Sequence, residues 1–143
     1  MQTSILYFWR MEQLRCLLDT PGLRVSYDTA NQWLYNQWQG AHTEASIKEG
    51  AAGVYACLAR VPCTKILSDH SEVVGNWQGA APWVGRQYFD RLARRGIRHF
   101  AWVYAPGYYD RVAMERSRFF SNRPVVAIFN DVASAYDWLC GCR

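Results

Sequence analysis

Long apolar stretches are missing from this sequence: none approaches the ~20 residues that a membrane-spanning helix needs. The apolar segment Ile5–Trp9 is short. It lacks the basic region before it and the small-residue cleavage site after it that mark a secretory signal. We therefore expect a soluble, cytoplasmic protein without a membrane span.

Lysine is also scarce, because Lys48 and Lys65 are the only two and arginine supplies the rest of the basic charge. No glycine-rich phosphate loop with its lysine follows a predicted strand. The net charge is only +4, whereas a dedicated nucleic-acid binder concentrates more charge on one face. The arginine-rich stretch 86–98, which Asp90 interrupts, is interpreted as a solvated helix face, with an anion or nucleic-acid patch as the alternative. We expect no nucleic-acid partner.

Metal-binding and catalytic patterns are missing as well. The five cysteines include no CxxC pair, and Cys140-Gly-Cys142 has no second pair to complete a zinc site. Their odd number indicates reduced thiols. The consecutive residues Asp69, His70 and Ser71 are the types of a hydrolase triad, but triad members converge through space and sequence neighbours point apart. We predict no catalytic residue, no metal site and no cofactor.

Aromatic side chains, in contrast, are abundant. The 143 residues are 50% hydrophobic and include seven Trp and nine Tyr. This length suits one domain with a real core. The aromatic side chains form either a bulky core, which is the interpretation we favour, or a surface that a partner covers.

Hydrophobic periodicity predicts alternating strands and helices after a short extension. Residues 1–20 are interpreted as an N-terminal extension, with a helix expected up to about Asp19, and residues 21–143 as one domain. The residues at near-helical spacing in the extension are Leu6, Trp9, Gln13 and Leu17. The predicted strands cover residues 23–27, 32–38, 64–69, 97–104 and 124–129. The predicted helices cover residues 42–60, 80–95, 108–120 and the end of the chain, with Thr43 and Asn130 as predicted N-caps.

These elements predict an α/β fold. A short link joins the first two strands, which indicates an antiparallel hairpin. Each later strand follows a helix, which favours a parallel crossover connection. The predicted fold is therefore a mixed β-sheet of about five strands, in which an N-terminal hairpin precedes parallel βα units with crossover helices.

A candidate binding site lies where the strand 64–69 ends. In open α/β sheets the carboxyl ends of the strands carry the sites, because loops and helix N-termini converge there. A long loop, expected to run from residue 68 to residue 82, follows this strand, and its two tryptophans are candidates for a surface that recognises something. The candidate residues for binding a partner or ligand are Asp69, His70, Asn76, Trp77 and Trp83.

A second candidate surface is aromatic. Trp33, Tyr35, Phe100, Trp102 and Tyr104 are predicted on one face of the sheet. If helices cover that face, these residues are core. If the helices lie on the other face only, the residues form an exposed patch, with Trp33, Tyr35 and Trp102 as interface residues for self-association.

The order of elements, together with several local strings, resembles a family of small bacterial proteins in the STAS superfamily, the fold of anti-sigma-factor antagonists. The same fold is loosely similar to CRAL-TRIO lipid-binding domains. The resemblance covers about residues 23–140. The strings are Val25-Ser-Tyr-Asp28, Leu34 through Gln39-Gly40, Lys65-Ile-Leu-Ser-Asp69, His99-Phe-Ala-Trp-Val103 and Phe129-Asn-Asp131 leading to Ala135-Tyr-Asp-Trp-Leu139.

One departure from the family pattern affects function. The resemblance implies an Asp-Ser-Ser/Thr-Gly string at the start of the helix after the third predicted strand, where a partner kinase phosphorylates the antagonist. This chain has Val74-Gly-Asn-Trp-Gln-Gly79 there, without Ser or Thr. Ser68 and Ser71 lie earlier, in the predicted loop. We therefore expect no phosphorylation switch of the family type.

Two functions remain open from the sequence. The first is a non-enzymatic regulatory module that binds a protein partner or a second copy of itself, as the resemblance implies. The second is a carrier or sensor that holds a small apolar or amphipathic ligand between helices and sheet. The second function requires a cavity of a few hundred Å³.

Overall fold

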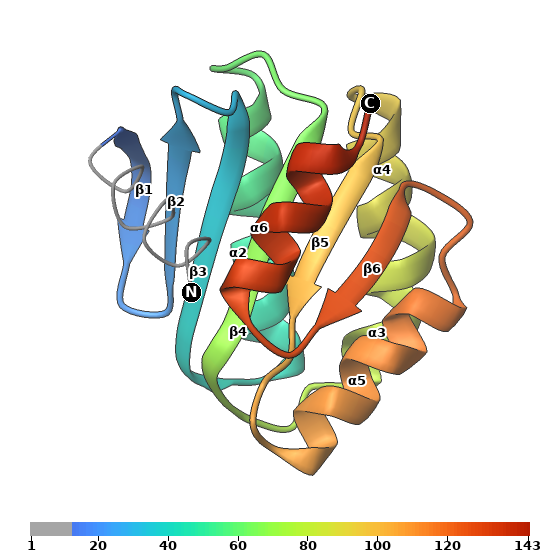
Figure 1. Ribbon diagram of the computed structural model, residues 1–143. Helices are drawn as coiled ribbons and strands as arrows, with labels where there is room; N and C mark the ends of the chain where they lie inside the picture. Colours follow the sequence, from blue (N-terminus) through green and yellow to red (C-terminus); the bar gives the residue numbers. More distant parts are fainter. Residues whose placement is uncertain (1–12) are drawn as a thin grey trace.

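The computed structural model describes residues 13–143. They form one six-stranded sheet whose spatial order follows the sequence (Figure 1). The strands are β1 (Leu14–Thr20), β2 (Leu23–Asp28), β3 (Trp33–His42), β4 (Lys65–Gly75), β5 (His99–Val103) and β6 (Val125–Phe129). Strands β1, β2 and β3 pair antiparallel, and β3 through β6 pair parallel. The predicted mixed α/β sheet is confirmed, with six strands in place of about five.

Helices cover both faces of this sheet. Helix α6 lies in front of the sheet in Figure 1, over β4 and β5, whereas α2 and α4 lie behind it. The helical segments are α2 (Glu44–Leu58), the 3₁₀ turn η1 (Gln78–Ala80), α3 (Ala81–Trp83), the π-helical turn η2 (Val84–Tyr88), α4 (Phe89–Arg94), α5 (Tyr108–Phe119) and α6 (Val132–Gly141). A separate hydrophobic cluster fills each side of the sheet. None of the helices in residues 13–143 has the length and apolar character that crossing a bilayer demands.

The first strand corrects the predicted N-terminal helix. The part expected to be helical up to Asp19 forms β1 from residue 14 onward, whereas residues 1–12 of that prediction lie outside the described residues. Pro21-Gly22 is the turn of a tight hairpin, since Thr20 pairs with Leu23 across it. A register shift near Leu17 lets both Leu17 and Leu18 pack on the same core. Pairing with β2 therefore prevails over the near-helical spacing.

Strand β4 is longer than predicted. The segment after Asp69, expected to be an irregular loop, continues the strand to Gly75 because β3 extends to His42 beside it. The register shifts after Asp69, and the Ser71 N–H donates to the Asp69 carboxylate at 2.8 Å. The polar residues that suggested a turn instead form a bulge within the ladder.

The two predicted N-caps have different outcomes. Thr43 caps α2, since its hydroxyl accepts from the Ser46 N–H at 3.2 Å and the Ser46 hydroxyl accepts from the Thr43 N–H. Asn130 is not the cap of α6. Asp131 takes this role, because its carboxylate accepts from the Ser134 N–H at 2.7 Å and stabilises the positive end of the helix.

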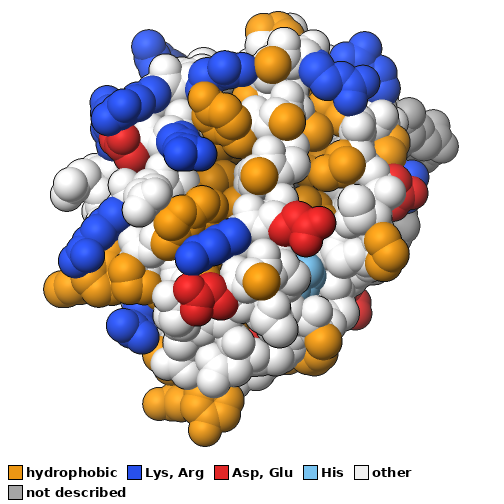
Figure 2. Space-filling view, turned by 180° about the vertical axis from the view of Figure 1, so that it is seen from behind, with side chains coloured by type: hydrophobic (Ala, Val, Ile, Leu, Met, Phe, Trp, Pro, Cys, Tyr) orange, Lys and Arg blue, Asp and Glu red, His pale blue; other side chains and the backbone are white. Residues whose placement is uncertain are grey.

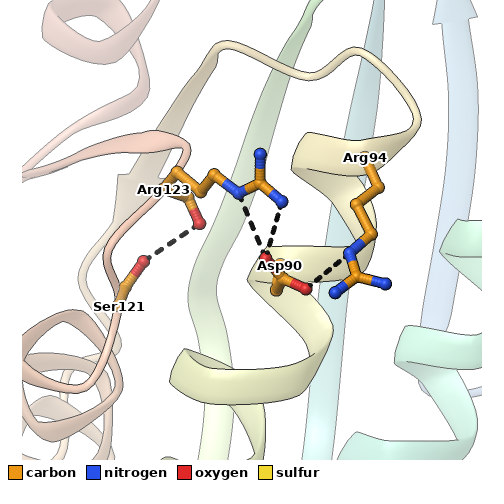
Figure 3. A network of polar contacts seen from close by, with 4 residues as sticks. All are labelled: Asp90, Arg94, Ser121 and Arg123. Atoms are coloured by element: carbon orange, nitrogen blue, oxygen red, sulfur yellow. Dashed lines mark hydrogen bonds and ion pairs between the residues drawn. The ribbon is translucent and has the colours of Figure 1, made fainter.

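The arginine side chains of the stretch 86–98 are exposed, and one of them, Arg94, forms an ion pair with Asp90. Asp90 on α4 binds two arginines, Arg123 through a 3.0 Å contact and Arg94 through a 2.9 Å contact (Figure 3). Seen from behind, basic side chains are spread over this face with hydrophobic ones between them (Figure 2). Exposed pairs of this kind contribute little stability, but the Arg123 pair links α4 to the segment before β6.

Gly85 in η2 lies directly against the C-terminal end of α5. A Cβ added there would lie 2.2 Å from the Ser117 carbonyl oxygen of α5 and 2.7 Å from the Phe120 Cβ. We expect Gly85→Ala to lower the free energy of unfolding by about 3 kcal/mol, at the upper end of overpacking costs. Urea unfolding measures the change. Gly141→Ala, with no atom within 4 Å of the added Cβ, is the matched control, and equal costs for the two variants would contradict this packing.

Candidate functional site

Two of the predicted binding residues meet in the interior rather than at the surface. His70 is 2% exposed and Trp77 is fully buried. Trp102, predicted as an interface residue, is 3% exposed and lies beside them. The prediction that Trp77 forms a recognition surface is therefore wrong, and Trp102 follows the alternative in which a covered aromatic face is core.

His70 is the centre of an aromatic cluster. Its ring lies 5.3 Å from the ring of Trp38, 5.7 Å from that of Trp77 and 5.4 Å from that of Trp102, measured between centroids. Tyr88 contributes to the same site from η2. We call these five residues the His70 cluster. Sequence analysis missed Trp38 and Tyr88, although both follow the apolar periodicity of their elements.

The sheet register explains why these residues converge. Side chains alternate between the faces of a strand, and Ser68 lies directly beside Trp102 on β5. His70, two residues after Ser68, therefore points to the same rear face. On β3, the Trp38 indole N–H donates to the Ser68 hydroxyl at 3.2 Å. The aromatic cluster thus follows from the strand pattern together with the unexpected continuation of β4.

The His70 cluster encloses a small cavity of about 20 Å³. Four polar atoms of its walls are buried without a hydrogen-bond partner: His70 Nδ1, the Tyr88 hydroxyl, Trp102 Nε1 and Trp77 Nε1. The Trp77 indole faces Asp110, whose Oδ1 is also buried without a standard hydrogen bond. Buried polar groups are normally paired in native proteins, so this concentration of unpaired groups distinguishes the site from ordinary core.

Burial shifts the titration of these groups. It lowers the pKa of His70 to about 3, with a smaller effect from the charge of His42, so the imidazole is neutral. Burial raises the pKa of the Tyr88 phenol well above its usual range. Burial also raises the pKa of the Asp110 carboxyl, while the facing Trp77 indole N–H opposes this shift. His70 and Tyr88 are therefore both uncharged near neutral pH.

The remaining predicted residues lie elsewhere. Asp69 and Asn76 make local turn contacts, with Ser71 and Gln78 respectively. Trp83 is half-buried, and its ring stacks on Tyr88 with 6.0 Å between centroids. The predicted binding residues therefore do not form one site.

The predicted interface residues Trp33 and Tyr35 are core. They face α6, on the opposite side of the sheet from Trp102, and are 2% and 4% exposed. The edge of the Trp33 ring contacts Tyr136 of α6, with centroids 5.2 Å apart. Because helices cover both faces, the first of the two alternatives applies and these aromatic residues are core. The predicted placement of all five on one face of the sheet is wrong.

An apolar groove of about 530 Å³ lies on the outer side of α5, and we call it the α5 groove. Its walls are formed by Tyr104, Tyr108, Arg111, Val112, Glu115, Arg116 and Phe119. Tyr108 is 74% exposed and Phe119 is 83% exposed. Sequence analysis missed this site. The sequence feature that could have indicated it is the adjacent aromatic pairs Tyr108-Tyr109 and Phe119-Phe120. Neighbouring residues on a helix point about 100° apart, so both members of a pair cannot lie in one buried stripe.

Charges around the α5 groove are unequally paired. The Tyr104 hydroxyl donates to Glu115, whose second oxygen binds Arg118 at 2.9 Å. Arg111 donates to the Ala105 carbonyl at 2.9 Å and lies over the Tyr104 ring. Arg116 is exposed and, within the described part of the chain, its guanidinium has no hydrogen-bond or ion-pair partner. The groove therefore offers exposed aromatic rings beside accessible positive charge.

The described residues contain no cluster of side chains that could bind a metal ion. No group of three or more His, Cys, Asp or Glu side chains in residues 13–143 lies in an arrangement that could hold a metal ion. The described cysteines, Cys16, Cys57, Cys63, Cys140 and Cys142, are free thiols. Burial raises the pKa of Cys63 to about 11, which disfavours its reactive thiolate form.

No family model matches the sequence, and no curated protein matches it either. Two solved structures are similar in fold. The anti-sigma factor antagonist SpoIIAA in its unphosphorylated form is 10% identical, with a TM-score of 0.53 over 91% of this chain and 98% of that chain. An uncharacterized DUF3478-family protein from Shewanella loihica, described as having a SpoIIAA-like fold, is 19% identical, with a TM-score of 0.52 over 87% of this chain and 98% of that chain. The resemblance expected from the sequence is confirmed at the level of fold: this chain has a STAS-like fold.

Proposed function

We propose that this protein is a non-enzymatic interaction module of the STAS-like type, which docks an acidic, apolar segment of a partner protein in the α5 groove. The observation that carries the proposal is the exposure of Tyr108 and Phe119 at either end of one groove. Large exposed apolar side chains that gather on one surface are typical of interaction sites.

The chemistry of the groove selects the partner. Exposed aromatic side chains and arginine are the residue types that most often dominate binding energy at protein interfaces. Glu115 is already paired with Arg118 and Tyr104, whereas Arg116 is accessible. Two copies of a chain with a net charge of +4 would bring like charges together at this surface. An acidic partner segment with aliphatic or aromatic side chains complements the groove better than a second copy does.

In this proposal, docking does not depend on a phosphorylated residue at the start of the helix after β4. The sequence from Glu72 to Ala81 has neither Ser nor Thr. The exposed Ser71 lies in the strand bulge, where its N–H binds Asp69. Regulation would then act on the partner or on its acidic segment.

The alternative function, a carrier of a small apolar ligand, has weaker support in the described residues. The cavity of the His70 cluster has a volume of only about 20 Å³, whereas a hollow between α2 and strands β1–β3 has about 360 Å³. Ligand pockets for small molecules usually have several hundred Å³. The hollow beside α2 has a suitable volume, but its walls contain none of the exposed large apolar side chains that mark the α5 groove.

Peptide binding tests the proposal. Two labelled peptides share leucine and tyrosine positions and differ only in having glutamate or lysine at the other positions. We expect the glutamate peptide to bind at least about tenfold more tightly by fluorescence anisotropy, which corresponds to ~1.4 kcal/mol. We also expect its affinity to fall as salt is added, because part of the attraction is between exposed charges.

Variants of the groove locate the binding. Tyr108→Ser combined with Phe119→Ser is expected to weaken the glutamate peptide about tenfold or more, and Arg116→Glu to weaken it by a similar factor. The matched control is Arg91→Glu, an exposed charge reversal on α4. Equal affinity for the two peptides, no measurable binding of the glutamate peptide, or equal losses in Arg91→Glu and Arg116→Glu would each contradict the proposal.

A further inference from the structure

The walls of the His70-cluster cavity contain buried polar atoms without a hydrogen-bond partner. His70, Tyr88 and Trp102 are 2%, 6% and 3% exposed, and each contributes one polar atom without a partner. The three residues come from β4, η2 and β5, which are separate elements. Leaving a buried donor or acceptor unsatisfied destabilises a fold substantially, so three such groups around one cavity favour a shared hydrogen-bond partner.

The hydrogen-bonding properties of the three groups define that partner. The Trp102 indole is a donor only, the Tyr88 hydroxyl donates or accepts, and Nδ1 of a neutral His70 can accept. An occupant that accepts two hydrogen bonds and donates one satisfies all three groups. Water is the smallest molecule with this capacity.

The size of the cavity agrees with this choice. A cavity needs roughly 10–15 Å³ to hold one water molecule, and a buried water typically makes about three hydrogen bonds. The cavity has about 20 Å³, which suits one water and excludes a drug-sized ligand. Aromatic walls without polar groups would stay dry, but the walls of this cavity contain three unpaired polar groups besides the Trp77 indole, which faces Asp110.

We propose that the cavity is a binding site for a single internal water molecule. The water accepts from the Trp102 indole and the Tyr88 hydroxyl and donates to His70 Nδ1, so that it joins the centre of the sheet to the π-helical turn. π-helical turns recur where a helix carries a functional site. Here the turn ends at Tyr88, whose ring stacks on the half-buried Trp83. The proposal is independent of the docking function, because no residue of the α5 groove takes part.

Nuclear magnetic resonance of the full chain tests the water site. Magnetisation transfer between water and the Trp102 indole proton is expected to have the sign of a long-lived, protein-bound water. A crystal structure at high resolution is expected to show one water within hydrogen-bond distance of all three atoms. A dry cavity, or direct hydrogen bonds among the three side chains, would overturn the proposal.

Removal of one hydroxyl gives the matched comparison. In Tyr88→Phe the water loses one of its three partners, so the transfer to the Trp102 indole proton is expected to weaken or disappear. In Tyr27→Phe the lost hydroxyl binds the Pro62 carbonyl directly, at 2.9 Å, and the transfer is expected to be unchanged. Unchanged transfer in Tyr88→Phe, or equal weakening in both variants, would show that the water does not bind in this way.

Discussion

Acidification from about pH 6 to about pH 3 is expected to lower the free energy of unfolding by up to ~1.4 kcal/mol per pH unit through His70 alone. The pKa of His70 falls from 6.5 to about 3 on folding, because the ring is buried and His42 is near. Between these values the unfolded chain binds a proton that the folded chain does not. The stabilisation from neutral His70 is therefore fully present above the pKa that His70 has in the unfolded chain. It is lost as the pH falls toward the pKa that His70 has in the folded protein.

Urea unfolding over a pH series measures this effect as a difference between the wild type and His70→Gln. The difference removes the contributions of other groups, such as Asp110, whose pKa burial raises, and Asp131, whose pKa the Ser134 N–H lowers. The matched control is His99→Gln, because His99 is more exposed.

The imidazole protons of His70 give a test that needs no variant. Their chemical shifts are expected to stay constant down to about pH 4, whereas a free imidazole in water titrates near pH 6.5. Stability curves that run parallel for the wild type and His70→Gln, or a His70 titration near its ordinary pKa, would contradict the buried, neutral state.

Trp77→Ala is expected to lower the free energy of unfolding by about 3–5 kcal/mol, the usual cost of replacing a buried large aromatic residue by alanine. Its side chain is fully buried and packs against the rings of His70 and Trp102. Denaturant unfolding of the purified variant measures the loss.

Trp83→Ala is the matched control. Trp83 follows Trp77 closely in sequence but is half-buried, with one ring face on Tyr88 and Lys48 over its ring. We expect its replacement to cost less than half as much as that of Trp77. A Trp77→Ala variant that loses less than about 1 kcal/mol would mean that the tryptophan is a surface residue, as the sequence had indicated.

The parts of the fold that sequence predicted well are those where local pattern and long-range pairing agree. Alternation in Leu23–Asp28 matches a hairpin strand, and the apolar residues of Val125–Phe129 match the parallel strand β6 at the edge of the sheet. Thr43 is a good cap in isolation and in the structure. The STAS-like order follows from these elements taken together.

The failures occur where a neighbouring strand decides the outcome. Leu14–Thr20 has no strong strand pattern of its own and becomes β1 because β2 offers an edge. Ser68 to Ser71 have the composition of a turn, but β3 continues beside them and keeps β4 extended. A local sequence pattern contains no information about how far a pairing partner extends.

The candidate sites were harder to predict than the fold. Trp77 follows the end of a strand, where exposure is the usual expectation, yet its ring turns inward onto His70. The α5 groove depends on which stripe of the helix faces the core. That stripe contains Ala113, Met114 and Ser117, with smaller side chains than the exposed Tyr108 and Phe119.

The most direct test of the docking function is a map of amide chemical-shift changes when the glutamate peptide is added to the labelled full chain. The proposal predicts changes concentrated on α5, between Tyr108 and Phe119, and at Tyr104, with none of comparable size on α6. Changes centred on α6 or on the β1–β2 hairpin, or no changes at all, would contradict it.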